Sequence, residues 1–299
     1  MSFTLKDVPL LSRSTIDRAE HIRADEQALK EGWARALLLH VDRRGRFRRT
    51  EGALVLEPAV GYSAEPSPNA VFLGTDPDGR HLWAIREPEL TGDLTDLRAM
   101  AGDLDDYTAG ILTAAMALLN WHDKAGFSGA DGVATAASKG GWSRTTEAGH
   151  EEFPRIDPAV ICLIHDGADR VLLARQHSWP PTLFSLLAGF VEAGESLERC
   201  VEREMLEEVG VHVRDITYLG SQPWPFPRSL MLGFAAVGDA EEELVFSDGE
   251  IAEAHWFTRA EVRAALEQGD WSARETGSRL LLPSSISIAR TIVESWAGV

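Results

Sequence analysis

Short apolar runs separated by turn signals dominate the first third of the chain. Runs such as "ARALLLHV", "GALVLEP", "NAVFLGT" and "HLWAIRE" are divided by polar segments such as "DRRGR" and "DPDGR". This alternation is typical of strands joined by tight turns. From about Asp105, apolar residues recur near every 3.6 positions, which predicts a long helix through "YTAGILTAAMALLNWHDKAG".

The pattern changes twice more along the chain. Residues 123–152 are small, polar and glycine-rich, and by composition they predict a linker or a poorly packed loop module. After Phe153, "PAVICLIHD" and "VLLARQ" predict buried strands, and "ITYLGSQPWPFPRSLMLGFAAVG" predicts at least two more. "EIAEAHWFTRAEVRAAL" predicts a strand and then a helix, and "SISIARTIVESWA" predicts an amphipathic helix. Strands and helices mixed in this order favour an α/β or α+β sandwich.

One predicted helix concentrates negative charge in the stretch "VEREMLEEVG", residues 201–210. A charge run on a helix is most often a solvated face, but the spacing here favours another interpretation. At about 100° per residue, Glu207 and Glu208 lie within roughly 60° of Glu204. These three carboxylates continue an apolar stripe and should face the protein, whereas Glu202 should face solvent.

Carboxylates that share a partly desolvated face repel one another, so a cation is the expected remedy. For an all-oxygen set the candidates are Mg²⁺ and Mn²⁺. Ser196 is a suitable N-cap for this helix and Gly210 a suitable end.

Composition limits the classes of function. The chain has 299 residues and a net charge of −18, which argues against a protein that grips nucleic acid through a basic surface. No apolar run is long enough to span a membrane and no secretion signal is evident, so a cytoplasmic protein is expected. Cys162 and Cys200 stand in apolar contexts and predict buried thiols without a disulfide framework.

The acidic helix and its lead-in, "GFVEAGESLERCVEREMLEEVGV", resemble a complete Nudix box. Gly189, the loop carboxylate Glu195, and Arg203 stand at its defined positions together with the three inward carboxylates. The resemblance implies an α/β/α sandwich that hydrolyses a diphosphate linked to a nucleoside with the help of divalent metal. The residues fit that chemistry, since glycine permits a tight loop and arginine can hold Glu195 by a charged hydrogen bond.

A second stretch, "SQPWPFPRSLM", resembles the signature that follows the box in NADH pyrophosphatases. Its prolines and aromatic residues form a stiff apolar element suited to stacking a planar ring. "LLNWHDKAGF" and "FPRIDPAVICLI" also resemble this family. The resemblance implies three parts: a β-rich N-terminal domain (1–122), a degenerate zinc-ribbon-like module (123–153) and a Nudix hydrolase domain (154–299).

The resemblance also implies roles for individual residues. The catalytic residues would be Arg203, Glu204, Glu207 and Glu208. The metal would be held by the Ala188 carbonyl and by Glu204, Glu207, Glu208 and Glu250. The substrate would be bound by Arg98, Phe153, Phe190, Gln222, Pro223, Trp224, Pro225, Phe226, Pro227, Arg228, Ser229, Met231 and Ala289. Family members are typically homodimers, so a homodimer is expected.

The chain departs from the family pattern at the zinc module. Where the family often has four cysteines, this sequence has Ser128, Asp131, Thr145 and Ala148. Structural zinc needs cysteine or histidine ligands, so no structural zinc is expected.

The leading hypothesis is a metal-dependent enzyme that cleaves NADH, and also NAD⁺, into NMN(H) and AMP. Removal of the NAD cap from RNA 5′ ends would use the same bond, and the acidic surface favours the free dinucleotide or a few leading nucleotides. Two alternatives are a Nudix hydrolase of ADP-ribose or a diadenosine polyphosphate, and a non-catalytic dinucleotide sensor. "SQPWPFPRSLM" argues against the first alternative, and the intact set of box carboxylates argues against the second.

Overall fold

Two structural units divide the chain in the computed structural model, which describes residues 3–100, 104–247, 249–271 and 279–299. One unit comprises Arg13–Ile156 and the short segment Trp224–Arg228. The other comprises Met1–Ser12, Asp157–Pro223 and Ser229–Val299. The units therefore group the expected zinc-ribbon-like module with the N-terminal domain, and the first twelve residues with the C-terminal one.

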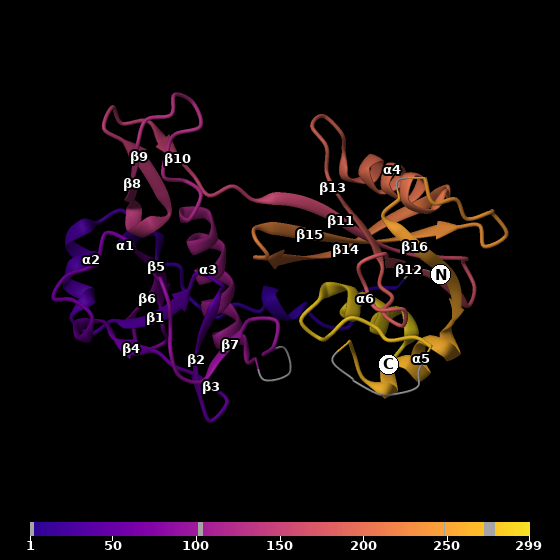
Figure 1. The fold of residues 1–299 in the computed structure, drawn as a ribbon, viewed down its shortest axis with the longest axis horizontal. Coiled ribbons are helices and arrows are strands. Elements are labelled where there is room, and N and C mark those ends of the chain that lie inside the picture. The colour runs from indigo at the N-terminus through magenta and orange to yellow at the C-terminus, as the bar shows by residue number, and fades with distance from the viewer. Residues whose placement is uncertain (1–2, 101–103, 248, 272–278) are drawn as a thin grey trace. The chain divides into compact units, whose positions relative to one another are not determined.

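The C-terminal unit is built on a six-stranded sheet in the order β14-β15-β11-β12-β16, with β13 paired to β11 (Figure 1). Its strands are β11 (Asp157–His165), β12 (Arg170–Gln176), β13 (Leu187–Phe190), β14 (Val213–Trp224), β15 (Ser229–Gly238) and β16 (Ile251–Thr258). Its helices are α4 (Leu197–Val209), α5 (Arg259–Gln268) and α6 (Ile288–Ala297), after a short 3-10 turn at Leu10–Ser12. β11 runs parallel to β15 and antiparallel to β12.

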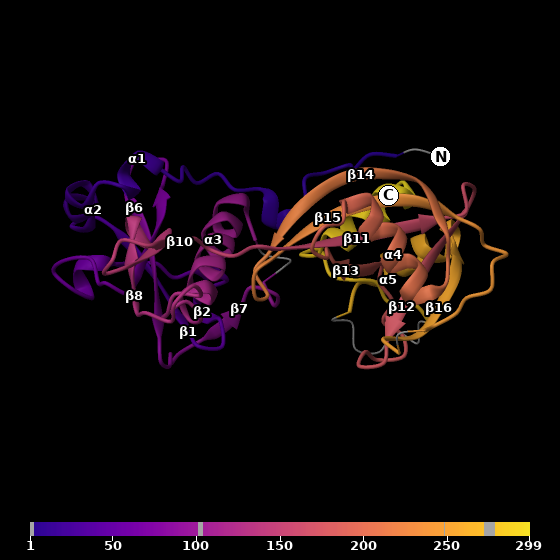
Figure 2. The same cartoon turned by 90° about the horizontal axis from the view of Figure 1, so that it is seen from above.

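The central strand β11 explains why this sheet is covered on both faces. Its side chains alternate, so that Val160 and Cys162 pack with α4 while Ile161 and Leu163 pack with α5 and α6. A strand buried on both faces is an almost continuous apolar run, as "AVICLI" is. Figure 1 shows α4 on one side of the sheet and α6 on the other, and Figure 2 shows the α4 side from above. The expected α/β/α sandwich is confirmed.

The N-terminal unit is β-rich, as expected. Its larger sheet has the order β3-β2-β1-β6-β5, with β4 paired to β1 and β7 to β2. The strands are β1 (Leu37–Asp42), β2 (Arg46–Thr50), β3 (Ala53–Leu54), β4 (Glu57–Pro58), β5 (Ala70–Thr75), β6 (His81–Glu87) and β7 (Leu94–Asp96). The expected long helix is α3 (Asp106–His122), which packs against β5 and β6. A 3-10 turn, Ala59–Gly61, follows β4.

Two short helices, α1 (Glu20–Arg23) and α2 (Glu26–Trp33), had not been predicted. α2 is too short and polar to stand out by periodicity. Asp25 caps its N-terminus, and the Trp33 ring is completely buried. Burial of such a ring stabilises by about 2 to 3 kcal/mol, more than the propensity of so short a segment supplies.

Three tight turns share one side-chain device. In each, an aspartate Oδ1 accepts the backbone N–H groups two and four residues later, and its Oδ2 accepts from an arginine Nε at 2.7–2.8 Å. The pairs are Asp42–Arg46, Asp76–Arg80 and Asp166–Arg170. The turns predicted at "DRRGR" and "DPDGR" are thereby confirmed, and the aspartate–arginine hydrogen bonds explain why they form.

Residues 123–152 fold into a three-stranded sheet, so the expected linker or poorly packed loop is wrong. Its strands are β8 (Thr135–Ser138), β9 (Ser143–Thr146) and β10 (Glu151–Glu152), in the order β10-β9-β8, with a 3-10 turn at Lys139–Gly141. The composition of this segment did not predict the sheet, because the sheet is stabilised by hydrogen bonds and not by a large apolar core. The Arg144 guanidinium is the hub: it donates to the Thr135 hydroxyl (2.7 Å) and carbonyl (2.6 Å) and to His122 Nδ1 (2.8 Å).

Three of the four residues at the family's cysteine positions, Ser128, Asp131 and Thr145, also form hydrogen bonds within this module. The buried Ser128 lies in a turn where Asp131 accepts the Val133 N–H at 3.1 Å. Thr145 Oγ1 donates to Ser138 Oγ at 2.8 Å. The resemblance of the module to a zinc ribbon stays a prediction. Cys162 and Cys200 are both buried free thiols, as expected.

Candidate active site

The acidic helix α4 begins and ends where the sequence predicted. Ser196 Oγ accepts the Arg199 N–H at 3.3 Å at the N-terminus. Gly210 ends the helix in the left-handed conformation at φ 74°, which costs glycine little. The helix is thus held at both ends, which fixes the direction of the side chains between them.

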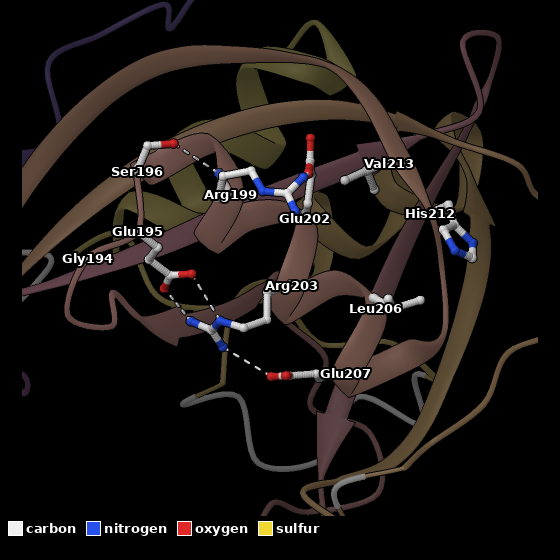
Figure 3. Close-up of a pocket in the computed structure, with 10 residues that line it drawn as sticks. All are labelled: Gly194, Glu195, Ser196, Arg199, Glu202, Arg203, Leu206, Glu207, His212 and Val213. Atoms are coloured by element: carbon white, nitrogen blue, oxygen red, sulfur yellow. Dashed lines mark hydrogen bonds and ion pairs between the residues drawn. The ribbon is translucent and has the colours of Figure 1, made fainter.

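Arg203 is the centre of the site. Its Nη2 and Nε donate to the two oxygens of Glu195 at 2.6 and 3.1 Å, a fork that matches the planar carboxylate. Its Nη1 donates to Glu204 at 2.9 Å and to Glu207 at 3.1 Å. Figure 3 shows the guanidinium between Glu195 on the loop and Glu207 on the helix. The predicted pairing of Arg203 with Glu195 is present, and the same guanidinium also binds Glu204 and Glu207.

The pKa values reflect this arrangement. The Arg203 guanidinium lowers the pKa of Glu195 to about 2, and the same pairing raises the pKa of Arg203. Burial raises the pKa of Glu204, although Arg203 works in the opposite direction. Burial also raises the pKa of the Cys200 thiol to about 12, so Cys200 stays protonated and packs as an apolar residue.

The sequence predicted that all three carboxylates face the protein, but only two of them do. Glu208 is 3% exposed and the Glu204 side chain is largely buried. The Glu207 side chain is 54% exposed, so the inward prediction is wrong for this residue. Glu207 lies at the edge of the inward stripe, four residues after Arg203, and it turns toward that guanidinium.

Gly189 makes room for Glu204. A Cβ atom at Gly189 would lie 1.8 Å from the Glu204 Cδ and 2.1 Å from both carboxylate oxygens. The carboxylate therefore fills the space that the missing side chain leaves, against the backbone of β13. A partly desolvated, oxygen-only group beside the Ala188 and Gly189 backbone fits a hard divalent cation.

An open hollow of about 850 Å³ lies along the outer side of α4. Glu195, Arg203 and Glu207 line it, together with Val213, the first residue of β14, and His212, which precedes it (Figure 3). The inward carboxylates of Glu204 and Glu208 do not line it.

The expected metal ligands are not gathered into one cluster. Among the described residues, no group of three His, Cys, Asp or Glu side chains lies close enough to hold a metal ion. Arg203 binds two of the carboxylates, Ala188 lies in β13, and the exposed Glu250 immediately precedes β16. The ligand set stays a prediction.

The tip of the β14–β15 hairpin, Trp224–Arg228, belongs to the N-terminal unit. Asn120 Nδ2 of α3 donates to the Pro225 and Pro227 carbonyls at 2.9 and 3.0 Å. The Arg98 guanidinium lies 4.2 Å from the Phe226 ring centroid and 5.9 Å from that of Trp224. Three of the expected substrate residues thus lie together. Asn120 had not been predicted, since its partners are 105 and 107 residues away and leave no local signal.

Other expected substrate residues occupy different environments. Phe153 and Phe190 are exposed, and Met231 packs partly against the core. The side chain of Gln222 is buried and bridges the Ile286 carbonyl (2.9 Å) and the Ile288 N–H (2.6 Å). Ala289 is buried in the core beside it. Gln222 therefore holds the start of α6, and neither residue lines an open surface.

Comparisons with known proteins agree with this fold. The NUDIX domain family model matches residues 155–279. The chain is 57% identical to the NAD-capped RNA hydrolase NudC of Mycobacterium tuberculosis (strain ATCC 25618 / H37Rv), over 99% of this chain and 97% of that protein. It is 40% identical to the mitochondrial NAD(P)H pyrophosphatase NUDT13 of Mus musculus, over 70% of this chain and 61% of that protein.

A third relative is the NAD-capped RNA hydrolase NUDT12 of Macaca fascicularis, 36% identical over 64% of this chain and 42% of that protein. The sandwich, the box on α4 and these matches define a hydrolase of the Nudix class. Within that class, the chain belongs to the NADH pyrophosphatase (NAD-capped RNA hydrolase) family.

Proposed function

We propose that the protein hydrolyses the pyrophosphate of NADH and NAD⁺ to NMN(H) and AMP, and that it removes the NAD cap from RNA 5′ ends. The observation that carries the proposal is the Arg203-centred carboxylate site in a chain that matches an NAD-capped RNA hydrolase over almost its whole length. The NUDT13 relative, an NAD(P)H pyrophosphatase, supports the free dinucleotide as a second substrate.

Residues of this chain would bind the divalent metal directly. Glu204 and Glu208 would be its principal ligands, with Glu207, Glu250 and the Ala188 carbonyl as further ligands, and Mg²⁺ or Mn²⁺ is the expected ion. When bound, such an ion makes the attacking water more acidic and neutralises charge on the phosphoryl oxygens. Arg203 fixes the loop through Glu195 and holds Glu204 and Glu207 near one another.

The proposed substrate residues form one group at and beside the hairpin tip and a second group outside it. Trp224, Phe226 and Arg98 offer flat apolar and cationic surfaces suited to a planar base or nicotinamide ring. Pro223, Pro225, Pro227, Arg228 and Ser229 complete this segment, and Phe153, Phe190 and Met231 are further candidates.

A homodimer in the cytoplasm is the expected setting. None of the helices that the structure describes is long and apolar enough to cross a membrane. No structural zinc is expected, because the module has serine, aspartate, threonine and alanine at the family's cysteine positions.

The test is product analysis by liquid chromatography. Purified protein is incubated with NADH and Mg²⁺ or Mn²⁺, beside Glu208→Gln and the control Glu202→Gln, which removes a half-exposed acid from the same helix. We expect NMNH and AMP from wild type and the control, and a rate at least about 100-fold lower for Glu208→Gln. If NADH survives with wild type, or if Glu208→Gln remains as fast as the control, the proposed function is wrong.

A further inference from the structure

The turn between β1 and β2 concentrates positive charge in an acidic protein. The stretch "DRRGRFRR", residues 42–49, contains five arginines, whereas the whole chain carries a net charge of −18. Three of the five are neutralised by carboxylates: Arg46 pairs with Asp42, Arg48 with Glu57, and Arg49 with Asp93. For Arg43 and Arg44, the described part of the chain supplies no carboxylate within ion-pair distance.

Hydrogen bonds make the turn rigid, so the backbone of these two exposed arginines is held in one conformation. The buried Asp42 accepts the Arg44 and Arg46 backbone N–H groups at 2.8 and 2.9 Å. Gly45, at φ 79°, brings the turn close to α3, where a Cβ would meet the Met116 Cε at 2.8 Å.

Arg43 and Arg44 line a hollow of about 340 Å³ within the N-terminal unit. Arg98, Asn120 and the hairpin residues Pro225 and Phe226 line the same hollow. The acid among its lining residues is Asp96, whose Oδ1 already accepts the N–H groups of Arg98 and Ala99 at 2.9 and 3.0 Å.

These groups match one class of ligand. Guanidinium groups bind phosphate through fixed forks of donors, and aromatic rings and arginine planes stack on unpaired bases. The hollow combines both features, and its hairpin wall belongs to the segment expected to bind the dinucleotide. We propose that Arg43 and Arg44 bind phosphates of the first nucleotides that follow the NAD cap of a single-stranded RNA. This proposal rests on the cap-removing activity proposed above, and a strongly acidic chain needs such a local basic site to hold RNA.

The test compares two substrates and two variants. The double variant Arg43→Gln/Arg44→Gln removes the two guanidinium groups, and Arg49→Gln, which removes one already paired with Asp93, is the matched control. We expect the double variant to lose about tenfold or more in kcat/KM on NAD-capped RNA of about 20 nucleotides and to keep its kcat/KM on NADH. Each phosphate contact on a single strand contributes about 0.7 to the salt slope, so the slope should become shallower by about 1.4. Arg49→Gln should leave both substrates unchanged.

Two results would overturn the proposal. Equal losses on NADH and capped RNA would place these arginines on the dinucleotide, and no loss on either would remove them from binding altogether. Fluorescence anisotropy with an uncapped RNA of the same length separates this proposal from the activity on which it rests. If wild type cleaves neither substrate, the proposed function fails, and weaker RNA binding by the double variant still supports the arginine site, whereas equal binding refutes it.

Discussion

The Glu204 carboxylate occupies the space beside the Gly189 Cα, so position 189 has no room for a side chain of its own. Because the Gly189 φ is not in the left-handed region, alanine there meets no backbone penalty, and the effect of the substitution comes from crowding alone. The carboxylate would have to leave its position against β13 if a Cβ were added at 1.8 Å from the Glu204 Cδ.

We expect Gly189→Ala to lower kcat/KM on NADH by at least about tenfold and to weaken Mn²⁺ binding, while the protein stays folded. Steady-state kinetics, Mn²⁺ titration and far-UV circular dichroism check these three outcomes. Gly61→Ala is the control, because a Cβ at Gly61 meets nothing within 4 Å. Unchanged activity and Mn²⁺ affinity in Gly189→Ala would show that the position of Glu204 against this strand is unimportant.

At this scale the sequence predicted contacts that depend on local spacing and missed those that do not. Arg203 and Glu195 are eight residues apart on a loop and a helix, and their pairing followed from the motif. The exposure of Glu207 did not, because a helical wheel gives an angle but not the pull of Arg203 four residues earlier. The buried role of Gln222 depends on α6, which begins 66 residues later.

The β8–β9–β10 sheet shows how an element forms where composition predicts none. Its polar network is centred on Arg144, whose pKa is lowered by burial, as is that of His122. Because Arg144 Nη1 donates to His122 Nδ1, the neutral His122 donates from Nε2 to the Gly141 carbonyl at 2.8 Å. Strands of four or fewer residues without alternating apolar positions give no periodic signal, whereas the long strands β11 and β15 and the helix α3 do.

We expect Arg144→Met to lower the free energy of unfolding by about 2 kcal/mol, because charged hydrogen bonds to Thr135 and His122 are lost. Urea unfolding measures this change. Lys139→Met, which removes an exposed ion pair with Glu151 in the same module, should cost at most about 1 kcal/mol. Treatment with a zinc chelator should leave the unfolding midpoint of wild type unchanged, and a large decrease would mean that metal holds the module after all.

At the scale of the whole molecule, we expect the predicted homodimer to bury some of the large apolar residues that are exposed in the single chain. Phe127 and Ile156, at 70% and 63% exposed, stand at the two ends of the stretch that contains the cysteine-less module, and Val133 in that stretch is also exposed. Soluble monomers rarely expose groups of large apolar side chains unless they bind a partner. The composition of the chain could not reveal this exposure, because it required the fold to place these residues at the surface.

The predicted homodimer would bury these exposed residues. Sedimentation equilibrium tests both the dimer and the part these residues play in it. We expect wild type at micromolar concentration to have about twice the 32.7 kDa mass of the chain. Phe127→Ser/Ile156→Ser should weaken the dimer by about tenfold or more, because apolar anchors dominate such interfaces. Val60→Ser removes an exposed apolar residue elsewhere in the same unit and should leave the mass unchanged. A monomeric wild type would refute the dimer, whereas a dimer that resists the double substitution would place the interface on another surface.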